Sequence, residues 1–107
     1  MAKKKPSSPP PVLDSARVLN YVIIGEEIKF SGRSLLFVDG KELGPVPCLA
    51  ICEERETGGV LLFHCKSDWT VLGCSAHASI SEAQKRAEHV YRGSSTRWVD
   101  AKDAAHR

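Results

Sequence analysis

Residues 58–100 limit the possible folds of this chain more than any other segment. The segment contains two apolar runs, then a helical pattern with clear ends, then a short last run that carries Trp98. Apolar runs of about four to eight residues between turn residues are typical of strands. The segment therefore predicts a small α+β domain in which one helix packs on a sheet, and nothing in it points to a particular chemistry.

The helix is predicted over residues 80–92. Ser79 suits the N-cap position, and Glu82 follows at the spacing of a capping box. Gly93 suits the position after the helix, where a positive φ is favoured. The apolar positions recur with the period of a helix, which indicates one buried side: Ile80, Ala83, Ala87, Val90 and Tyr91. Two pairs on the opposite side have i, i+4 spacing and are expected to be solvated: Glu82 with Arg86 and Glu88 with Arg92.

The rest of the chain is predicted to form short strands. Residues 18–24 fit either a helix or a strand, and their β-branched and aromatic content favours the strand. A meander follows, with hairpin turns expected at Ser31-Gly32 and Asp39-Gly40, because Asp-Gly suits a type I′ turn. The strands expected in and after the meander are 27–30, 33–38, 41–43, 48–52, 60–65, 69–74 and 96–99.

Two of these runs, residues 48–52 and 60–63, are apolar on both faces of a strand. One helix covers only one face of a sheet, so the other face needs a second cover. The meander of residues 27–43 would supply it within the chain, and a second copy of the chain would supply it in a homodimer. The predicted fold is an antiparallel, meander-rich curled sheet of about five to seven short strands with one principal C-terminal helix.

We expect a single domain over residues 12–100. Residues 1–11 are rich in Lys, Ser and Pro, which is typical of a disordered tail. Residues 101–107 are expected to be a flexible C-terminal tail. The N-terminal residues lack the apolar region of a secretory signal. We therefore expect a cytoplasmic protein with reduced thiols and no membrane partner.

The charge balance gives no support to a surface that binds nucleic acid. The chain has 15 basic and 13 acidic side chains, a formal net charge of +2. Lys3, Lys4 and Lys5 supply three of the basic residues, so the predicted domain itself is close to neutral. A domain that binds a nucleic-acid duplex usually carries a cluster of basic side chains.

Cysteine and histidine residues offer ligands for a metal ion. Cys74 and His77 have the spacing of a zinc knuckle. Cys48 and Cys52 would lie roughly 13 Å apart along a strand, at about 3.3 Å per residue, which is too far for one zinc ion. His64 lies in an apolar strand and is expected to be a hydrogen-bonded structural residue. We therefore expect structural thiols and no cofactor, with a small zinc protein as one alternative.

No nucleophile, base and orienting group occur at a spacing that joins them, and no phosphate-binding glycine motif is present. We therefore expect a small non-enzymatic binding or adaptor domain that acts through protein–protein contact. Its partner would be another protein or a second copy of the chain. A nucleic-acid-associated domain is the alternative from another class, and it would use Lys3, Lys4 and Lys5 together with exposed Trp69 and Trp98.

Overall fold

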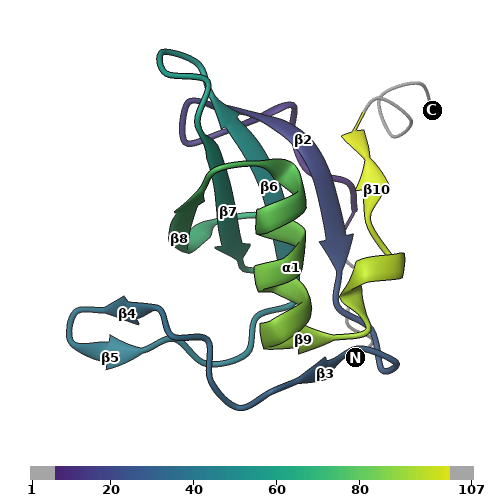
Figure 1. Ribbon diagram of the computed structural model, residues 1–107. Coiled ribbons are helices and arrows are strands. Elements are labelled where there is room, and N and C mark those ends of the chain that lie inside the picture. Colours follow the sequence, from purple (N-terminus) through teal and green to yellow (C-terminus); the bar gives the residue numbers. More distant parts are fainter. Residues whose placement is uncertain (1–6, 102–107) are drawn as a thin grey trace.

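A computed structural model of the chain describes residues 7–101 (Figure 1). The predicted α+β fold is confirmed, because the helix α1 packs on a curved antiparallel sheet. In chain order the elements are β1 (Val12–Leu13), β2 (Ala16–Ile23), β3 (Lys29–Phe30), β4 (Phe37–Val38), β5 (Lys41–Glu42), β6 (Cys48–Glu54), β7 (Val60–Cys65), β8 (Val71–His77), α1 (Ile80–Val90), β9 (Tyr91–Arg92), the 3₁₀ helix η1 (Ser94–Thr96) and β10 (Val99–Asp100).

The main sheet has six strands, in the order β1-β2-β6-β7-β8, with β10 also paired to β2. The outer side of β2 therefore carries two short strands, β1 at one end and β10 at the other. The opposite edge of the sheet is β8 (Figure 1). Two further pairs, β3–β9 and β4–β5, lie outside this sheet. The segment 18–24, which fits either a helix or a strand by its pattern, belongs almost entirely to β2.

The start of α1 agrees with the prediction, and its end does not. Ser79 is the N-cap, and its Oγ accepts a 3.1 Å hydrogen bond from the backbone N–H of Glu82. The helix ends at Val90, two residues earlier than expected, because Tyr91 and Arg92 become a strand paired with β3. Tyr91 is nevertheless fully buried, as its place in the apolar stripe predicts.

The predicted buried side of α1 is confirmed for Ala83, Ala87 and Val90, whereas Ile80 is 37% exposed at the helix start. Neither predicted i, i+4 pair is an ion pair in the part of the chain that the structure describes. Glu88 instead accepts hydrogen bonds from the backbone N–H groups of Gly93 and Ser95, at 3.0 and 2.9 Å. These bonds lower the pKa of Glu88 and hold the turn after the helix.

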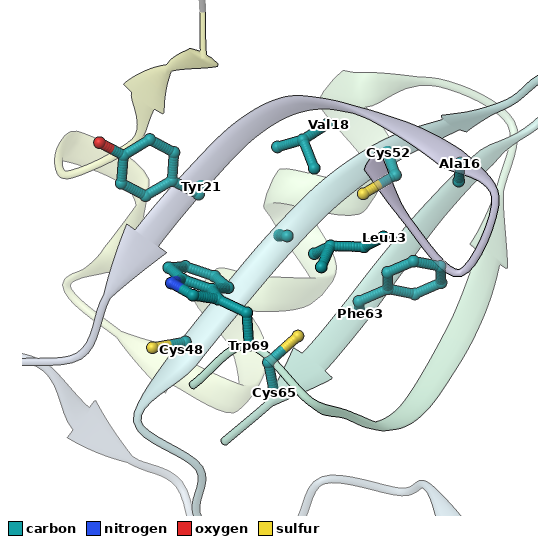
Figure 2. Packing of buried hydrophobic residues seen from close by; sticks show 10 residues of the cluster. Leu13, Ala16, Val18, Tyr21, Cys48, Cys52, Phe63, Cys65 and Trp69 are labelled. Carbon is teal, nitrogen blue, oxygen red and sulfur yellow. The ribbon is translucent and has the colours of Figure 1, made fainter. Parts of the chain in front are cut away.

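Apolar side chains fill both faces of the sheet, in two separate cores. The helix-side core lies under α1 and contains Val22, Ile28, Val46, Leu49, Ile51, Leu62, Ala83, Ala87, Val90 and Tyr91. The far-side core lies on the opposite face and contains Leu13, Ala16, Val18, Tyr21, Cys48, Ala50, Cys52, Phe63, Cys65 and Trp69 (Figure 2). Both faces are thus covered within one chain.

The predicted cover of the far face was wrong. The meander packs on the helix side, where Phe30 and Leu43 contact the helix-side core. The reason is that β3 pairs with β9, which directly follows α1 and draws the meander to that side. Trp69 and Leu13 close the far face instead, and the Trp69 ring meets Tyr21 edge-on with centroids 5.7 Å apart (Figure 2).

Two turn predictions had opposite outcomes. The Asp39-Gly40 hairpin is confirmed, since it joins β4 to β5 with positive φ values of 52° and 80°. The Ser31-Gly32 hairpin is wrong, because β3 pairs with β9 rather than with the residues after the turn. Several strand boundaries also differ from the prediction, and the strand expected over 33–38 is reduced to Phe37–Val38. Trp69 has a φ of 70° and belongs to the turn before β8, and η1 with β10 replaces the strand expected over 96–99.

Residues 1–6 and 102–107, at the two ends of the chain, lie outside the described residues. Lys3, Lys4 and Lys5 are therefore not described. Ser7 and Pro11 are described, and their carbonyl oxygens accept hydrogen bonds from the Trp69 Nε1–H at 2.7 Å and the Val18 N–H at 2.9 Å. The division into tails and a domain over residues 12–100 stays a prediction. Within residues 7–101, no helix is long and apolar enough to cross a membrane.

Candidate functional site

A pocket of about 140 Å³ lies on the helix side of the sheet beside the edge strand β8. Four segments contribute to it: the loop before β4, then β7, β8 and α1. Its lining residues, in chain order, are Ser34, Leu35, Leu36, His64, Ser75 and Arg86. We call it the β8 pocket. Polar groups that converge from separate segments on a small hollow are typical of a binding site.

His64 is the most deeply buried polar residue of this pocket, with 1% of its surface exposed. Burial, together with a smaller effect of the nearby His77, lowers its pKa to about 4, so the ring is neutral at pH 7. Its Nδ1 is fully buried and has no hydrogen-bond partner within residues 7–101. A buried nitrogen of this kind is free to bond a polar group that enters the pocket. The structural histidine was predicted to be hydrogen-bonded, and no such bond is found at its Nδ1 within residues 7–101.

Ser75 and His77 share a hydrogen bond of 2.7 Å between Oγ and Nε2. They lie two positions apart on β8, so their side chains point to the same face of the sheet. Partial burial and the charge of Arg86 lower the pKa of His77, and Glu82 opposes this shift. In the described residues no carboxylate bonds the other ring nitrogen of His77, so the pair lacks the orienting group of a hydrolase triad.

Arg86 is the charged residue of the β8 pocket. It projects from the exposed side of α1 and, among residues 7–101, has no carboxylate within ion-pair distance. A guanidinium offers a planar set of N–H donors that matches a carboxylate with two parallel hydrogen bonds. The pocket therefore holds one positive charge that no side chain lining it neutralises.

The loop that forms the outer wall of the pocket is held in an unusual conformation. Leu35 has a left-handed φ of 61°, which costs a non-glycine residue roughly 1–2 kcal/mol. Its backbone N–H donates a 2.9 Å hydrogen bond to Glu42, which lowers the pKa of that carboxyl. Ser34 Oγ donates to the carbonyl of Leu43 at 2.7 Å. Backbone strain of this kind is concentrated at functional sites.

The edge strand beside the pocket has no strand paired to its outer side within residues 7–101. Within residues 7–101, β8 pairs with β7 alone, whereas the opposite edge strand carries β1 and β10. Its seven residues include no charged side chain and no proline. An irregular register interrupts the ladder near its start, and residues 73–77 then pair regularly with β7. Edge strands normally carry charges, prolines or a cover that prevent pairing with another chain. In the described structure β8 has no charged residue and no proline, and the β4–β5 hairpin contacts it only near Gly73.

Exposed apolar side chains lie next to this edge. Leu35, Phe37 and Val38 are 48%, 62% and 40% exposed, and we call them the hairpin patch. The β4–β5 hairpin that carries most of it projects from the body of the domain (Figure 1). The hairpin touches β8 at Gly73, where an added Cβ would meet the side chain of Val38 at 3.6 Å. The patch and the open edge thus form one continuous region.

The structure does not bring the predicted zinc ligands together. Cys74 and His77 lie three positions apart in β8, so their side chains point to opposite faces of the sheet. Cys74 is exposed, and His77 is bonded to Ser75. Among residues 7–101, no group of three or more His, Cys, Asp or Glu side chains is placed to hold a metal ion.

The two tryptophans do not offer open ring faces. Trp69 is 5% exposed, and its Nε1–H is bonded to Ser7. Trp98 is half-buried and packs against the helix-side core. Its Nε1 is fully buried and has no hydrogen-bond partner within the described residues. A role for either ring in stacking on bases would need a conformation other than this one.

The buried thiols form part of the far-side core. Cys48 and Cys65 lie opposite one another across β6 and β7, and both are free. Burial raises the pKa of Cys48 to about 11 and the pKa of Cys52 and Cys65 to about 12, so these groups stay protonated at pH 7. Cys74 lies opposite Phe63 rather than Cys65, so these two cysteines are not cross-strand neighbours.

A larger hollow of about 410 Å³ lies at the other end of the sheet, between the β1–β2 and β6–β7 turns. Most of its lining residues are exposed turn residues, such as Asp14, Arg55 and Glu56. It contains no buried polar group without a partner. The β8 pocket is therefore the better candidate for a specific site.

The β8 pocket could hardly be predicted from local sequence patterns. Ser34, His64, Ser75 and Arg86 come from distant positions in the chain. The register of β7 with β8 brings His64 to the same side as Ser75, and the packing of α1 and of the loop before β4 adds Arg86 and Ser34. Ser75 and His77 at alternate positions of one strand were the available signal. Comparison of the chain with protein-family models, with curated proteins and with solved structures found no match. The functional argument therefore rests on the pocket, the open edge and the hairpin patch.

Proposed function

We propose that this domain is a non-enzymatic protein-binding module whose strand β8 takes up an extended segment of a partner protein. The observation that carries the proposal is the uncharged, unpaired outer side of β8 in the described structure. In strand addition, main-chain hydrogen bonds supply the affinity, and alternate side chains of the added segment supply the selectivity. At the other side of the sheet, β1 and β10 pair with the outer side of β2. The outer side of β8 has no such pairing in the described structure, which makes β8 the better candidate for strand addition.

The hairpin patch supports the same proposal. Six large apolar side chains are exposed in the described structure, and three of them, Leu35, Phe37 and Val38, fall within four consecutive residues beside β8. Grouped apolar exposure of this kind is typical of contact surfaces. Apolar side chains of the added segment would pack on this patch while its backbone pairs with β8.

Two other assignments have less support. In a homodimer through β8, the strand added to each copy would be β8 of the other copy. Because β8 contains no acidic residue, this arrangement would leave Arg86 without a negatively charged partner from the added strand. A nucleic-acid role gains nothing from Trp69, which is buried. The cytoplasmic location stays part of the proposal, and the free thiols Cys48 and Cys65, which face one another, suit a reducing compartment.

The proposal is tested with extended peptides. Dodecapeptides are selected from a random library on the immobilised full chain, and their affinities are measured by fluorescence anisotropy. Each backbone N–H of a selected peptide is then methylated in turn. We expect methylation at every second residue to weaken binding at least tenfold, because alternate N–H groups face β8, and the intervening positions to tolerate it.

A pair of matched variants locates the contact. Val38 and Val12 are both 40% exposed and both lie in two-residue strands, but Val38 lies beside β8 and Val12 lies at the opposite edge. Val38→Ser should weaken the selected peptide several-fold, and Val12→Ser should not. The proposal is overturned if no peptide binds, if methylation has no alternating effect, or if the chain associates with itself through β8 instead.

A further inference from the structure

We infer that the β8 pocket binds a carboxylate carried by the segment that pairs with β8, and that Arg86 recognises its charge. This inference rests on the strand addition proposed above and names the chemistry of the partner. Arg86 lines the pocket and has no ion pair within the described residues. Among the described residues no carboxylate lines the pocket, so a single negative charge from a partner would complement it.

The other polar groups of the pocket suit an acidic oxygen. The buried Nδ1 of His64 has no hydrogen-bond partner within residues 7–101, and in the neutral tautomer that carries the proton on Nδ1 it would donate to an acceptor in the pocket. Ser75 contributes a hydroxyl that is already oriented by its 2.7 Å bond to His77. A carboxylate with its several acceptor sites would satisfy the guanidinium and the imidazole together.

The volume of the pocket limits the size of the group. Its 140 Å³ compares with about 30 Å³ for one water molecule in the liquid. That room suits a carboxylate on one or two methylene groups, as in an Asp or Glu side chain. One guanidinium among neutral donors also matches the single charge of a carboxylate better than the double charge of a phosphate.

The position of the pocket connects it to the proposed strand addition. Ser75 belongs to β8 and points to the helix side, into the pocket. In an antiparallel pair, the residue opposite Ser75 on an added strand would have its Cβ about 4.5–5.5 Å away and would point to the same side. The added residue next to the hairpin patch would lie opposite Gly73, two positions away. We therefore infer a partner segment with an acidic and an apolar residue two positions apart.

The experiment uses the peptides selected on the full chain, each with a counterpart in which the acidic residue is replaced by its amide, Glu by Gln or Asp by Asn. The loss of a charge-assisted hydrogen bond should weaken binding roughly ten- to hundredfold. Arg86→Gln should weaken the acidic peptide by a similar factor and leave the amide peptide nearly unchanged. Lys85→Gln is the matched control, because Lys85 is an exposed neighbour on α1 that does not line the pocket.

The outcomes separate this inference from the proposed function. Equal binding of acidic and amide peptides, or equal effects of Arg86→Gln and Lys85→Gln, would overturn the carboxylate site while peptide binding at β8 stands. A peptide with phosphoserine at the acidic position that binds tenfold more tightly would reassign the pocket to phosphate. If no peptide pairs with β8, both conclusions are overturned.

Discussion

The indole Nε1–H of Trp69 donates a 2.7 Å hydrogen bond to the backbone carbonyl of Ser7, 62 positions earlier in the chain. Trp69 closes the far-side core, and its φ of 70° places it in the turn before β8. The contact ties the segment of residues 7–11 to the core through one of the largest side chains of the domain. Ser7 is thereby linked to the turn that sets the start of β8, the strand on which the proposed function depends.

This contact predicts that residues 7–11 contribute to stability. A chain that starts at Val12 should be less stable than one that starts at Ser7 by about 1–3 kcal/mol, because the buried Trp69 N–H would lose its acceptor. Urea unfolding of the two chains measures the difference. Trp69→Phe in both chains is the control. It removes the indole N–H donor, so the difference in unfolding free energy between the two chains should become smaller. Equal unfolding midpoints would agree with a disordered tail and contradict this account.

Burial of His64 predicts a loss of stability in acid. Its folded pKa of about 4 lies below the unfolded value of 6.5, so the unfolded chain binds a proton more readily. The stabilising effect of the neutral ring is complete above pH 6.5 and is lost as the pH falls to about 4, a change of about 3 kcal/mol. Urea titrations at several pH values should show this slope in the wild type.

The matched variants for this prediction are His64→Leu and His89→Gln. His64→Leu removes the titrating ring, so its stability should fall less between pH 6.5 and 4 than that of the wild type. His89 is exposed on α1, so His89→Gln is the comparison variant that removes a histidine outside the core. The same slope in the wild type and in His64→Leu would show that other groups cause the acid effect.

The four cysteines should differ in reactivity. Cys74 is exposed, whereas Cys48, Cys52 and Cys65 are fully buried with a pKa of about 11 to 12. We expect a thiol reagent at pH 8 to modify one site quickly in the native protein and all four after denaturation, because only accessible thiolate reacts. Cys74→Ser should remove the fast phase. Fast reaction of all four native thiols would contradict the packing of the far-side core.

The strained loop at the β8 pocket predicts opposite effects on stability and binding. Leu35 is 48% exposed and has a φ of 61°, so Leu35→Gly relieves strain and loses little buried surface. We expect the free energy of unfolding to stay the same or rise by up to about 1 kcal/mol, and peptide affinity to fall because the hairpin patch loses a side chain. A clear loss of stability would show that Leu35 has a packing role.

Local signals in the sequence were enough for several elements. Ser79 and the apolar stripe identified α1, continuous apolar runs identified β6 and β7, and Asp39-Gly40 identified its hairpin. Each of these signals lies within a few neighbouring residues, where capping, periodicity and turn geometry act. The helix end was missed because pairing of β9 with β3 outweighs the continued apolar pattern at Tyr91.

The features that could not be predicted from the sequence depend on contacts between residues that are distant in the chain. The register of β7 with β8, in which Ser75 lies opposite Leu62, decides that Ser75 faces the same side as His64. A shift of one residue would turn Ser75 to the other face. The path of the meander and the cover of the far face likewise depend on pairings such as β3 with β9, which no local pattern encodes.

The central claim is that β8 accepts an added strand, and amide hydrogen exchange tests it most directly. In the free protein, alternate amides of residues 73–77 face outward from the sheet and should exchange rapidly. When a selected peptide is bound, these alternate amides should become protected, and the amides of β2 at the opposite edge should not change. Protection of β2, or unchanged exchange throughout β8 with the peptide bound, would contradict the account.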